Sequence, residues 1–194
     1  LLAFGANANL VLVGELYPET VHLITNADGP KNIKAIDKKN GKIAVGSPGG
    51  GAAVTWAAFV KTDTDYKDIA TVPVGGSRAL SELQAIHIDA ILVVGGIGHG
   101  DVMRANSTPG IKLSDINDGA FDNPKYQDRK IYKFAKISAK QYPGLIGFFD
   151  ITTLQVPAVF VVNAEWADRN SKLYDILFDA SNSAIPLIRQ TVIK

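Results

Sequence analysis

The chain has 194 residues, a formal net charge of +1 and 46% hydrophobic residues. This length allows one ordinary domain or two small lobes with a sizeable core, and the composition excludes a disordered chain. Lys and Arg are dispersed, which argues against a nucleic-acid partner, and no apolar run approaches the roughly 20 residues that cross a bilayer. Cysteine is absent, so the chain has no disulfide, thiolate nucleophile or cysteine metal site. The chain begins with Leu1, and we interpret this start as an internal cut that leaves any targeting signal outside the sequence.

The hydrophobic pattern predicts strands and helices in alternation. In chain order we expect an extended segment over 9–25 interrupted at Tyr17-Pro18-Glu19, a turn over 26–30, a short helix through 33–36, a strand over 42–45, a helix over 52–60, a strand over 69–74, a helix capped by Ser77, a strand over 89–94 and a helix through 102–103. Signals between 111 and 142 are mixed, with a turn at Asp122-Asn123-Pro124 and a weak helix. Strands over 151–155 and 158–162 and a closing helix over 171–181 complete the prediction.

Two glycine turns carry the main functional signal. The turn over 46–51 joins an apolar strand to an apolar helix, and a similar turn over 95–100 follows the buried strand over 89–94. The start of such a helix offers unpaired N–H groups and the positive end of the helix dipole, which suit an anion such as a carboxylate. The alternative is a tight connection that binds nothing. Because strand and helix alternate from 42 to 105, we predict a right-handed parallel unit with both turns at the carboxyl edge of its strands.

The remaining chemistry favours binding over catalysis. The second turn lacks the third glycine of a dinucleotide site, because Asp101 stands at that position. His22, His87 and His99 have no metal-ligand spacing, although His99 lies in the second turn, where it can touch a ligand. Arg78 is either a partner for a ligand carboxylate or a surface residue, and the alternatives for Tyr17 are ligand contact and core packing.

Four segments, which follow one another along the chain, form a recognisable set. They are Leu16–Leu23 (LYPETVHL), Gly41–Gly51 (GKIAVGSPGGG), Leu80–Ile97 with its IDAILVVGG stretch, and Ile137–Val162 with Tyr142-Pro143-Gly144 and Thr153–Ala158. Together they resemble the TAXI family of periplasmic solute-binding proteins, which deliver ligands to TRAP transporters. The likeness covers nearly the whole chain.

The resemblance implies an α/β protein with the type II periplasmic-binding-protein fold, in which two α/β lobes joined by hinge strands close on a ligand. Residues 1–25 would form the hinge and the end of the first lobe, 26–140 the complete second lobe, and 141–194 the return to the first lobe with a C-terminal helix. The N-terminal part of the family's first lobe has no counterpart in this chain. We therefore expect an exposed apolar face and self-association.

Three departures from the family pattern bear on ligand binding. Gly50-Gly51-Ala52 stands where the family has Ser-Gly-Thr, so two hydroxyl donors are missing. Gly98 replaces a common proline, and His87 stands where glycine is common. These changes put the identity of the ligand in question, and ligand binding itself.

The resemblance predicts an extracytoplasmic, periplasmic subunit of a TRAP-type transporter that captures glutamate, a related amino acid or a 2-oxoacid, without catalysis, cofactor or metal. Its partners would be the small carboxylate ligand and the TRAP transporter membrane subunits. The predicted ligand-binding residues are Tyr17, Gly46, Ser47, Pro48, Gly49, Gly50, Gly51, Ala52, Arg78, Gly95, Gly96, Ile97, Gly98 and His99. The alternatives are a degenerate binding fold that acts as an interaction or antigenic protein without transport, and a nucleotide-dependent enzyme that uses the turn over 96–100.

Overall fold

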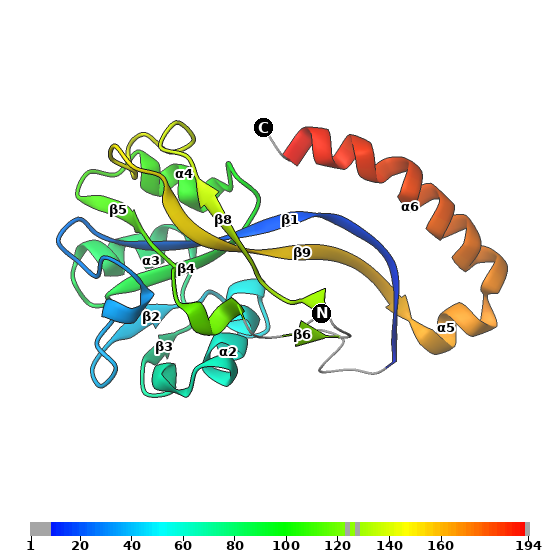
Figure 1. The fold of residues 1–194 in the computed structure, drawn as a ribbon, viewed down its shortest axis with the longest axis horizontal. Coiled ribbons are helices and arrows are strands. Elements are labelled where there is room, and N and C mark those ends of the chain that lie inside the picture. The colour runs from blue at the N-terminus through cyan, green and yellow to red at the C-terminus, as the bar shows by residue number, and fades with distance from the viewer. Residues whose placement is uncertain (1–8, 123–124, 127–128, 193–194) are drawn as a thin grey trace.

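A mixed seven-stranded sheet organises the protein (Figure 1). The computed structural model describes residues 9–122, 125–126 and 129–192. The strands of the sheet are β1 (Leu10–Asn26), β2 (Lys42–Ala44), β3 (Ala70–Val72), β4 (Ala90–Gly95), β5 (Ile111–Ser114), β8 (Lys133–Ile137) and β9 (Ile151–Asn163). A separate small ladder joins β6 (Lys125–Tyr126) to β7 (Arg129–Lys130).

Helices and short 3₁₀ turns connect these strands. The helices are α2 (Gly51–Thr62), α3 (Gly76–Gln84), α4 (Gly100–Asn106), α5 (Ala164–Arg169) and α6 (Ser171–Val192), and the 3₁₀ turns are η1 (Ile33–Ala35), η2 (Thr64–Tyr66) and η3 (Gly119–Asp122). No helix in the described part of the chain combines the length and the apolar character that crossing a membrane requires.

The strand order is β3-β2-β4-β1-β9-β8. The ladders β2–β3 and β2–β4 are parallel, which confirms the predicted α/β unit, and the others are antiparallel. Thr20 to Thr25 of β1 pair with β4 on one edge, and on the other edge β1 pairs first with β9 and then with β5. β1 and β9 therefore tie the two ends of the molecule together.

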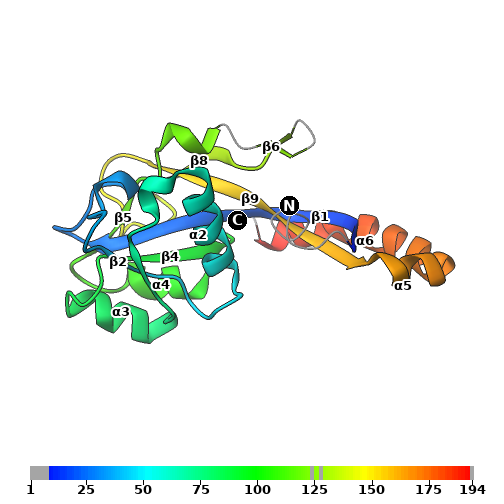
Figure 2. The same ribbon diagram turned by 90° about the horizontal axis from the view of Figure 1, so that it is seen from below.

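Alternating side chains on the central strands build a core on each face of the sheet. In β4, Ala90 and Leu92 join a cluster with Trp56 and Phe59 of α2, whereas Ile91 and Val93 point into a cluster with α3 and α4. Figure 2 shows α2 and the pair α3 and α4 on opposite sides of the sheet. This period-2 alternation with apolar residues on both faces is what a buried strand requires.

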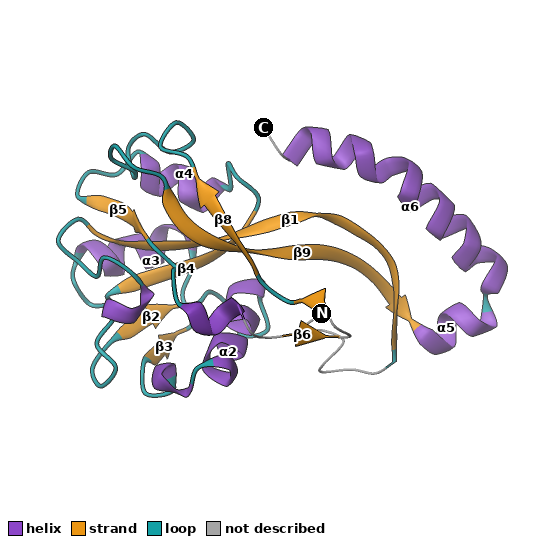
Figure 3. Ribbon diagram, viewed as in Figure 1, coloured by secondary structure: helices purple, strands orange, loops and turns teal. Residues whose placement is uncertain are grey.

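The first half of β1 and the second half of β9 extend beyond this body and carry α5 and α6 (Figure 3). α6 packs along β1, where the Tyr174 hydroxyl donates to the Leu12 carbonyl (3.0 Å). A Cβ at Gly14 would lie 2.9 Å from Ile185 Cδ1, so glycine allows the helix to approach the strand closely.

The closing helix α6 is longer than predicted, and the short helix α5 that precedes it was not predicted. α6 runs 11 residues past the expected end at 181, through Pro186, because Ile185 is buried and Arg189 bonds to β1 on either side of that proline. Asn163 caps α5 by accepting a hydrogen bond from Trp166 N (3.0 Å). The strands expected around Pro157 are one continuous strand, and the expected turn at Asp122-Asn123-Pro124 falls partly outside the described residues.

One local prediction on α3, its cap at Ser77, was wrong. Gly75 occupies the N-cap position and Ser77 lies inside the first turn, because the helix begins at Gly76. At the other end, Ile86 and not His87 holds the left-handed conformation (φ +59°) in which glycine is normally found. His87 N donates to Glu82 O and Ile86 N to Leu83 O, the pattern of a helix C-terminus closed by a left-handed residue.

Candidate functional site

Three strand-to-helix turns meet at one edge of the sheet. β2, β3 and β4 are parallel neighbours, and α2, α3 and α4 follow directly after them. Each connection contains glycine, and each helix begins at the carboxyl edge of its strand. In open α/β sheets, this is the edge at which ligands bind.

Backbone hydrogen bonds fix the turn that precedes α2. Gly46 N donates to the Val74 carbonyl (3.0 Å), which ties the turn to the chain after β3, and Gly50 N donates to the Ser47 carbonyl (3.0 Å). Gly46 (φ +71°) and Gly49 (φ +76°) adopt left-handed conformations, which glycine reaches without steric cost. The turn is therefore an ordered structure.

The N-termini of α2 and α3 carry no side-chain caps. Gly50 and Gly75 occupy the two N-cap positions, and neither first turn contains an acidic residue. The first N–H groups of an α-helix have no partner within the helix. Both helix starts are thus free to donate to an anion, and the helix dipole favours negative charge there.

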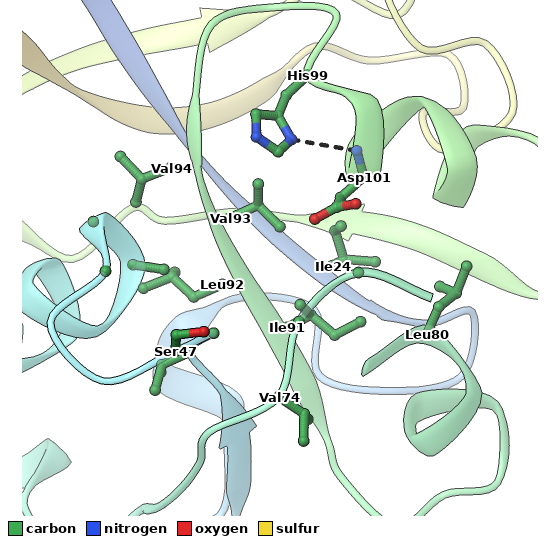
Figure 4. A pocket seen from close by; sticks show the side chains of 17 residues that line it. Ile24, Ser47, Val74, Leu80, Ile91, Leu92, Val93, Val94, His99 and Asp101 are labelled. Atoms are coloured by element: carbon green, nitrogen blue, oxygen red, sulfur yellow. Dashed lines mark hydrogen bonds between the residues drawn. The ribbon is translucent and has the colours of Figure 1, made fainter. Parts of the chain in front are cut away.

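His99 and Asp101 sit at the start of α4 (Figure 4). His99 Nδ1 accepts a hydrogen bond from Asp101 N (3.3 Å), and the imidazole ring lies so close to Gly95 that a Cβ there would be 2.5 Å from Cδ2. Asp101 Oδ1 accepts from Arg104 Nη1 (2.7 Å) and lies 3.7 Å from the place of a Cβ at Gly76. A carboxylate therefore stands beside the start of α3.

These turns enclose a cavity of about 190 Å³, called cavity 1 below. Its lining combines turn backbone with buried aliphatic side chains and the polar groups of Ser47, His99 and Asp101 (Figure 4). The lining residues are Ile24, Val45, Gly46, Ser47, Gly50, Gly51, Ala52, Val74, Gly75, Gly76, Leu80, Ile91, Leu92, Val93, Val94, His99 and Asp101. The cavity offers backbone hydrogen-bond donors at two helix starts and the carboxylate of Asp101, polar features that suit a small polar solute.

A protein-family model described as the NMT1-like family matches residues 2–177. The chain belongs to the NMT1-like family.

The fold of this NMT1-like chain is similar to that of solved binding proteins. An ancestral arginine-binding protein bound to arginine matches with a TM-score of 0.56 and 13% identity over 95% of this chain and 65% of that one. The GluR0 ligand-binding core in complex with L-glutamate matches with a TM-score of 0.52 and 13% identity over 98% of this chain and 66% of that one. The chain thus spans slightly less than two thirds of the length of each. The matches confirm the type II periplasmic-binding-protein fold.

A second hollow, with a volume of about 350 Å³, adjoins cavity 1 and shares the lining residues Gly51 and Val94 with it. Glu19 of β1 contributes a carboxyl group to its lining. Burial raises the pKa of Glu19, and the neighbouring His99 counteracts part of this rise. A second acidic group therefore lies near the start of α2.

The structure brings some of the predicted binding residues together and separates others. The members that line cavity 1 are Gly46, Ser47, Gly50, Gly51, Ala52 and His99. Pro48 and Gly49 belong to the same turn, and Gly95, Gly96, Ile97 and Gly98 form the connection that leads to His99, but none of these six lines the cavity. Arg78 is exposed on α3 and does not line the cavity. Tyr17 lines a different hollow, formed by residues of β1, β7, β8, β9 and α6.

Three features of the site are absent from the residues predicted from the sequence: the third turn, at Val74, Gly75 and Gly76, and the acidic side chains of Asp101 and Glu19. The third turn has the same strand–glycine–helix pattern as the other two, so its signal was present in the sequence. No such signal was present for Glu19, because this residue is distant along the chain from the three turns. Only the pairing of β1 with β4 brings it close to them.

A buried pair supports the turn before α4. The Tyr142 hydroxyl accepts a hydrogen bond from Gly98 N (2.7 Å) and lies 3.3 Å from His22 Nε2. Burial lowers the pKa of His22 to about 4, so this ring is neutral at physiological pH. Within the described ranges, no group of three or more His, Cys, Asp or Glu side chains is arranged to hold a metal ion.

Proposed function

We propose that the chain is the solute-binding subunit of a transporter and that it captures a small carboxylate ligand in cavity 1. The observation that carries the proposal is the start of α2, which has no side-chain cap, has no acidic residue in its first turn and lines a cavity at the carboxyl edge of parallel strands. The ligand carboxylate would accept hydrogen bonds from the backbone of Gly51 and Ala52. Backbone donors serve here in place of the hydroxyls that Gly50 and Ala52 lack.

The charges around cavity 1 favour an amino acid over a 2-oxoacid. Asp101 faces the cavity and Glu19 lies in the hollow next to it, so acidic groups stand near an anion-binding helix start. A zwitterion satisfies both, because its carboxylate meets α2 and its ammonium group meets a carboxylate. The structures with the same fold were solved with arginine and with L-glutamate, which supports this class of ligand.

The proposal also includes the type of transporter and the location of the protein. The resemblance of LYPETVHL and GKIAVGSPGGG to TAXI segments supports a TRAP-type system and a periplasmic location. We assign 26–140 to the second lobe, and 1–25 and 141–194 to the hinge and the returning first lobe. Residues 10–20 and 155–163 of the long strands β1 and β9, which pair with each other, would bend when the lobes close on the ligand.

Calorimetric titration with L-glutamate, L-arginine and 2-oxoglutarate tests the proposal. We expect saturable heat with an amino acid and loss of that heat in Gly51→Asp, which places a carboxylate at the start of α2. Gly147→Asp is the matched control, since a Cβ at either glycine meets nothing within 4 Å. The proposal fails if no small acid gives heat, or if the two variants bind equally well.

A further inference from the structure

A larger hollow, called the hinge cavity here, lies where the β1–β9 pair leaves the main sheet. It has a volume of about 700 Å³, compared with about 190 Å³ for cavity 1, and the two share no lining residue. Pockets that bury small organic molecules have volumes of roughly 300–1,000 Å³. The hinge cavity is therefore large enough for a ligand of its own.

Basic side chains from three elements converge on the hinge cavity. Lys130 comes from β7, Lys133 from β8 and Arg189 from α6, and Glu15 is the one acidic residue in the lining. Three positive charges and one negative charge leave an excess of +2 at neutral pH. Asp122 lies 2.6 Å from Lys130 Nζ and neutralises one of these charges, which still leaves a net positive site.

Arg189 is held in place by neutral acceptors. Its Nε donates to the Leu16 carbonyl (2.8 Å) and its Nη2 to the Glu15 carbonyl (3.0 Å). These carbonyls lie at a β-bulge, where Leu16 and Tyr17 together face Ala158, so the ladder leaves their oxygens available. The bonds orient the guanidinium group without neutralising its charge, and an oriented arginine is suited to a carboxylate.

Lys133 completes the charged side. It is exposed and lies directly opposite Gln155 in the β8–β9 ladder, and Gln155 also lines the cavity. The apolar part of the lining comes from Tyr17, Ile131 and Val156. These residues are half-buried and present an aromatic ring and branched aliphatic groups. Cations therefore stand beside an apolar wall.

The geometry points to a second ligand site in the hinge cavity, which takes a small organic anion with a flat apolar body, of the aromatic carboxylate class. The carboxylate meets Arg189 and Lys133, and the ring packs against Tyr17 and Val156. Such a ligand contacts β1, β8, β9 and α6 at once, so it braces the bulge in β1. The inference does not rest on solute capture in cavity 1.

Amide NMR shifts of the labelled chain during a benzoate titration test this site. We expect saturable shifts at Tyr17, Lys133 and Val156 with a dissociation constant of about 1 mM or below. Benzamide, the neutral counterpart, should bind at least about fivefold more weakly, and Lys133→Gln should weaken benzoate binding about threefold. Lys136→Gln is the matched control, because Lys136 is an exposed lysine on the same strand that does not line the cavity.

Three results would each overturn the inference. Equal affinity for benzoate and benzamide would remove the role of the cations. Equal affinity for inorganic phosphate and benzoate would remove the role of the apolar wall. Shifts confined to the amides of 50–52 would place the anion in cavity 1, and because they would leave solute capture intact, the two proposals can fail separately.

Discussion

Pro18 of β1 lies directly opposite Pro157 of β9 in the antiparallel ladder that joins the two ends of the molecule. Neither residue has an N–H group, so neither can donate to the ladder at this position. The β-bulge at Leu16 and Tyr17 precedes Pro18 immediately and interrupts the pairing further. The longest ladder of the sheet is therefore weakest at the point where it leaves the main body.

This weakness predicts fast hydrogen exchange at the junction. We expect the amide of Tyr17 to exchange at least about tenfold faster than those of Leu23 and Ile24, which lie in a segment paired on both edges. Exchange read by mass spectrometry on peptides that cover 14–19 and 20–26 measures the difference. Equal protection in the two peptides would show that the proline pair does not loosen the ladder.

Local patterns were sufficient to predict the parallel unit. The strand over 42–45, the glycine turn and the helix that follows are determined by neighbours in sequence, and they lie where the sequence placed them. The same holds for 89–94, whose continuous apolar run is explained by a core on each face of β4. The type II fold followed from the resemblance, because no single pattern determines the order of the strands.

Contacts between distant residues account for what the sequence did not show. Pro186 argues against a helix, yet α6 continues past it because Arg189 bonds to carbonyls 173 and 174 positions away. Likewise Tyr17 lies in the hinge cavity and not in cavity 1, because the bulge alters the register of β1 around it. No local signal reports a register shift.

Replacing Ile86 with glycine should stabilise the protein. Ile86 has φ +59° and is 80% exposed, so it carries the cost of a left-handed conformation and buries little. That cost is about 1–2 kcal/mol for a residue with a Cβ, and part of it is offset by the flexibility that glycine adds to the unfolded chain. We expect Ile86→Gly to raise the free energy of unfolding by about 1 kcal/mol, which corresponds to a Tm about 2–4 °C higher.

Ile86→Ala separates backbone strain from loss of the side chain. Alanine removes most of the isoleucine but keeps the Cβ that makes the left-handed conformation costly. The alanine variant should therefore gain clearly less stability than the glycine variant in thermal unfolding. Equal gains in both would mean that the exposed side chain, and not the backbone, is the source of the instability.

Buried His22 should make the protein less stable in acid. Burial disfavours the charged ring and lowers the pKa of His22 to about 4 in the folded chain. The ordinary value of 6.5 applies to the unfolded chain. The unfolded chain therefore binds the proton more tightly than the folded chain does. The contribution of neutral His22 to the free energy of unfolding is complete above pH 6.5 and is lost as the pH falls toward 4. The loss between pH 7 and pH 4 amounts to about 3 kcal/mol, measurable by urea unfolding across this range.

His22→Phe tests this assignment, because phenylalanine fills a similar space and does not titrate. Buried carboxyl groups also contribute to acid sensitivity: burial alone would raise the pKa of Asp118, but hydrogen bonds from Tyr66, Ala120 and Lys34 hold it below its usual range. The difference between the wild type and His22→Phe therefore isolates the histidine. If the two pH profiles run parallel between pH 6.5 and pH 4, His22 is not the group responsible.

The loop between β8 and β9 exposes two adjacent aromatic side chains. Phe148 is 100% exposed and Phe149 85% exposed, whereas Leu145 in the same loop is 3% exposed and buried against α3 and α4. Exposed apolar side chains of this kind promote association. Replacing both phenylalanines with serine should leave Tm unchanged, lower the fluorescence of a bound hydrophobic dye and reduce concentration-dependent association in sedimentation velocity.

Leu145→Ala is the matched control in that loop. Leu145 N donates to the Tyr142 carbonyl (3.0 Å), its own carbonyl accepts from Leu113 N (3.0 Å), and its side chain is packed. Truncating a buried leucine costs about 2–5 kcal/mol, so this variant should unfold at a clearly lower temperature and keep the dye signal of the native loop. A fall in Tm in the double serine variant of the same size would mean that Phe148 and Phe149 are packed in solution and do not form an exposed tip.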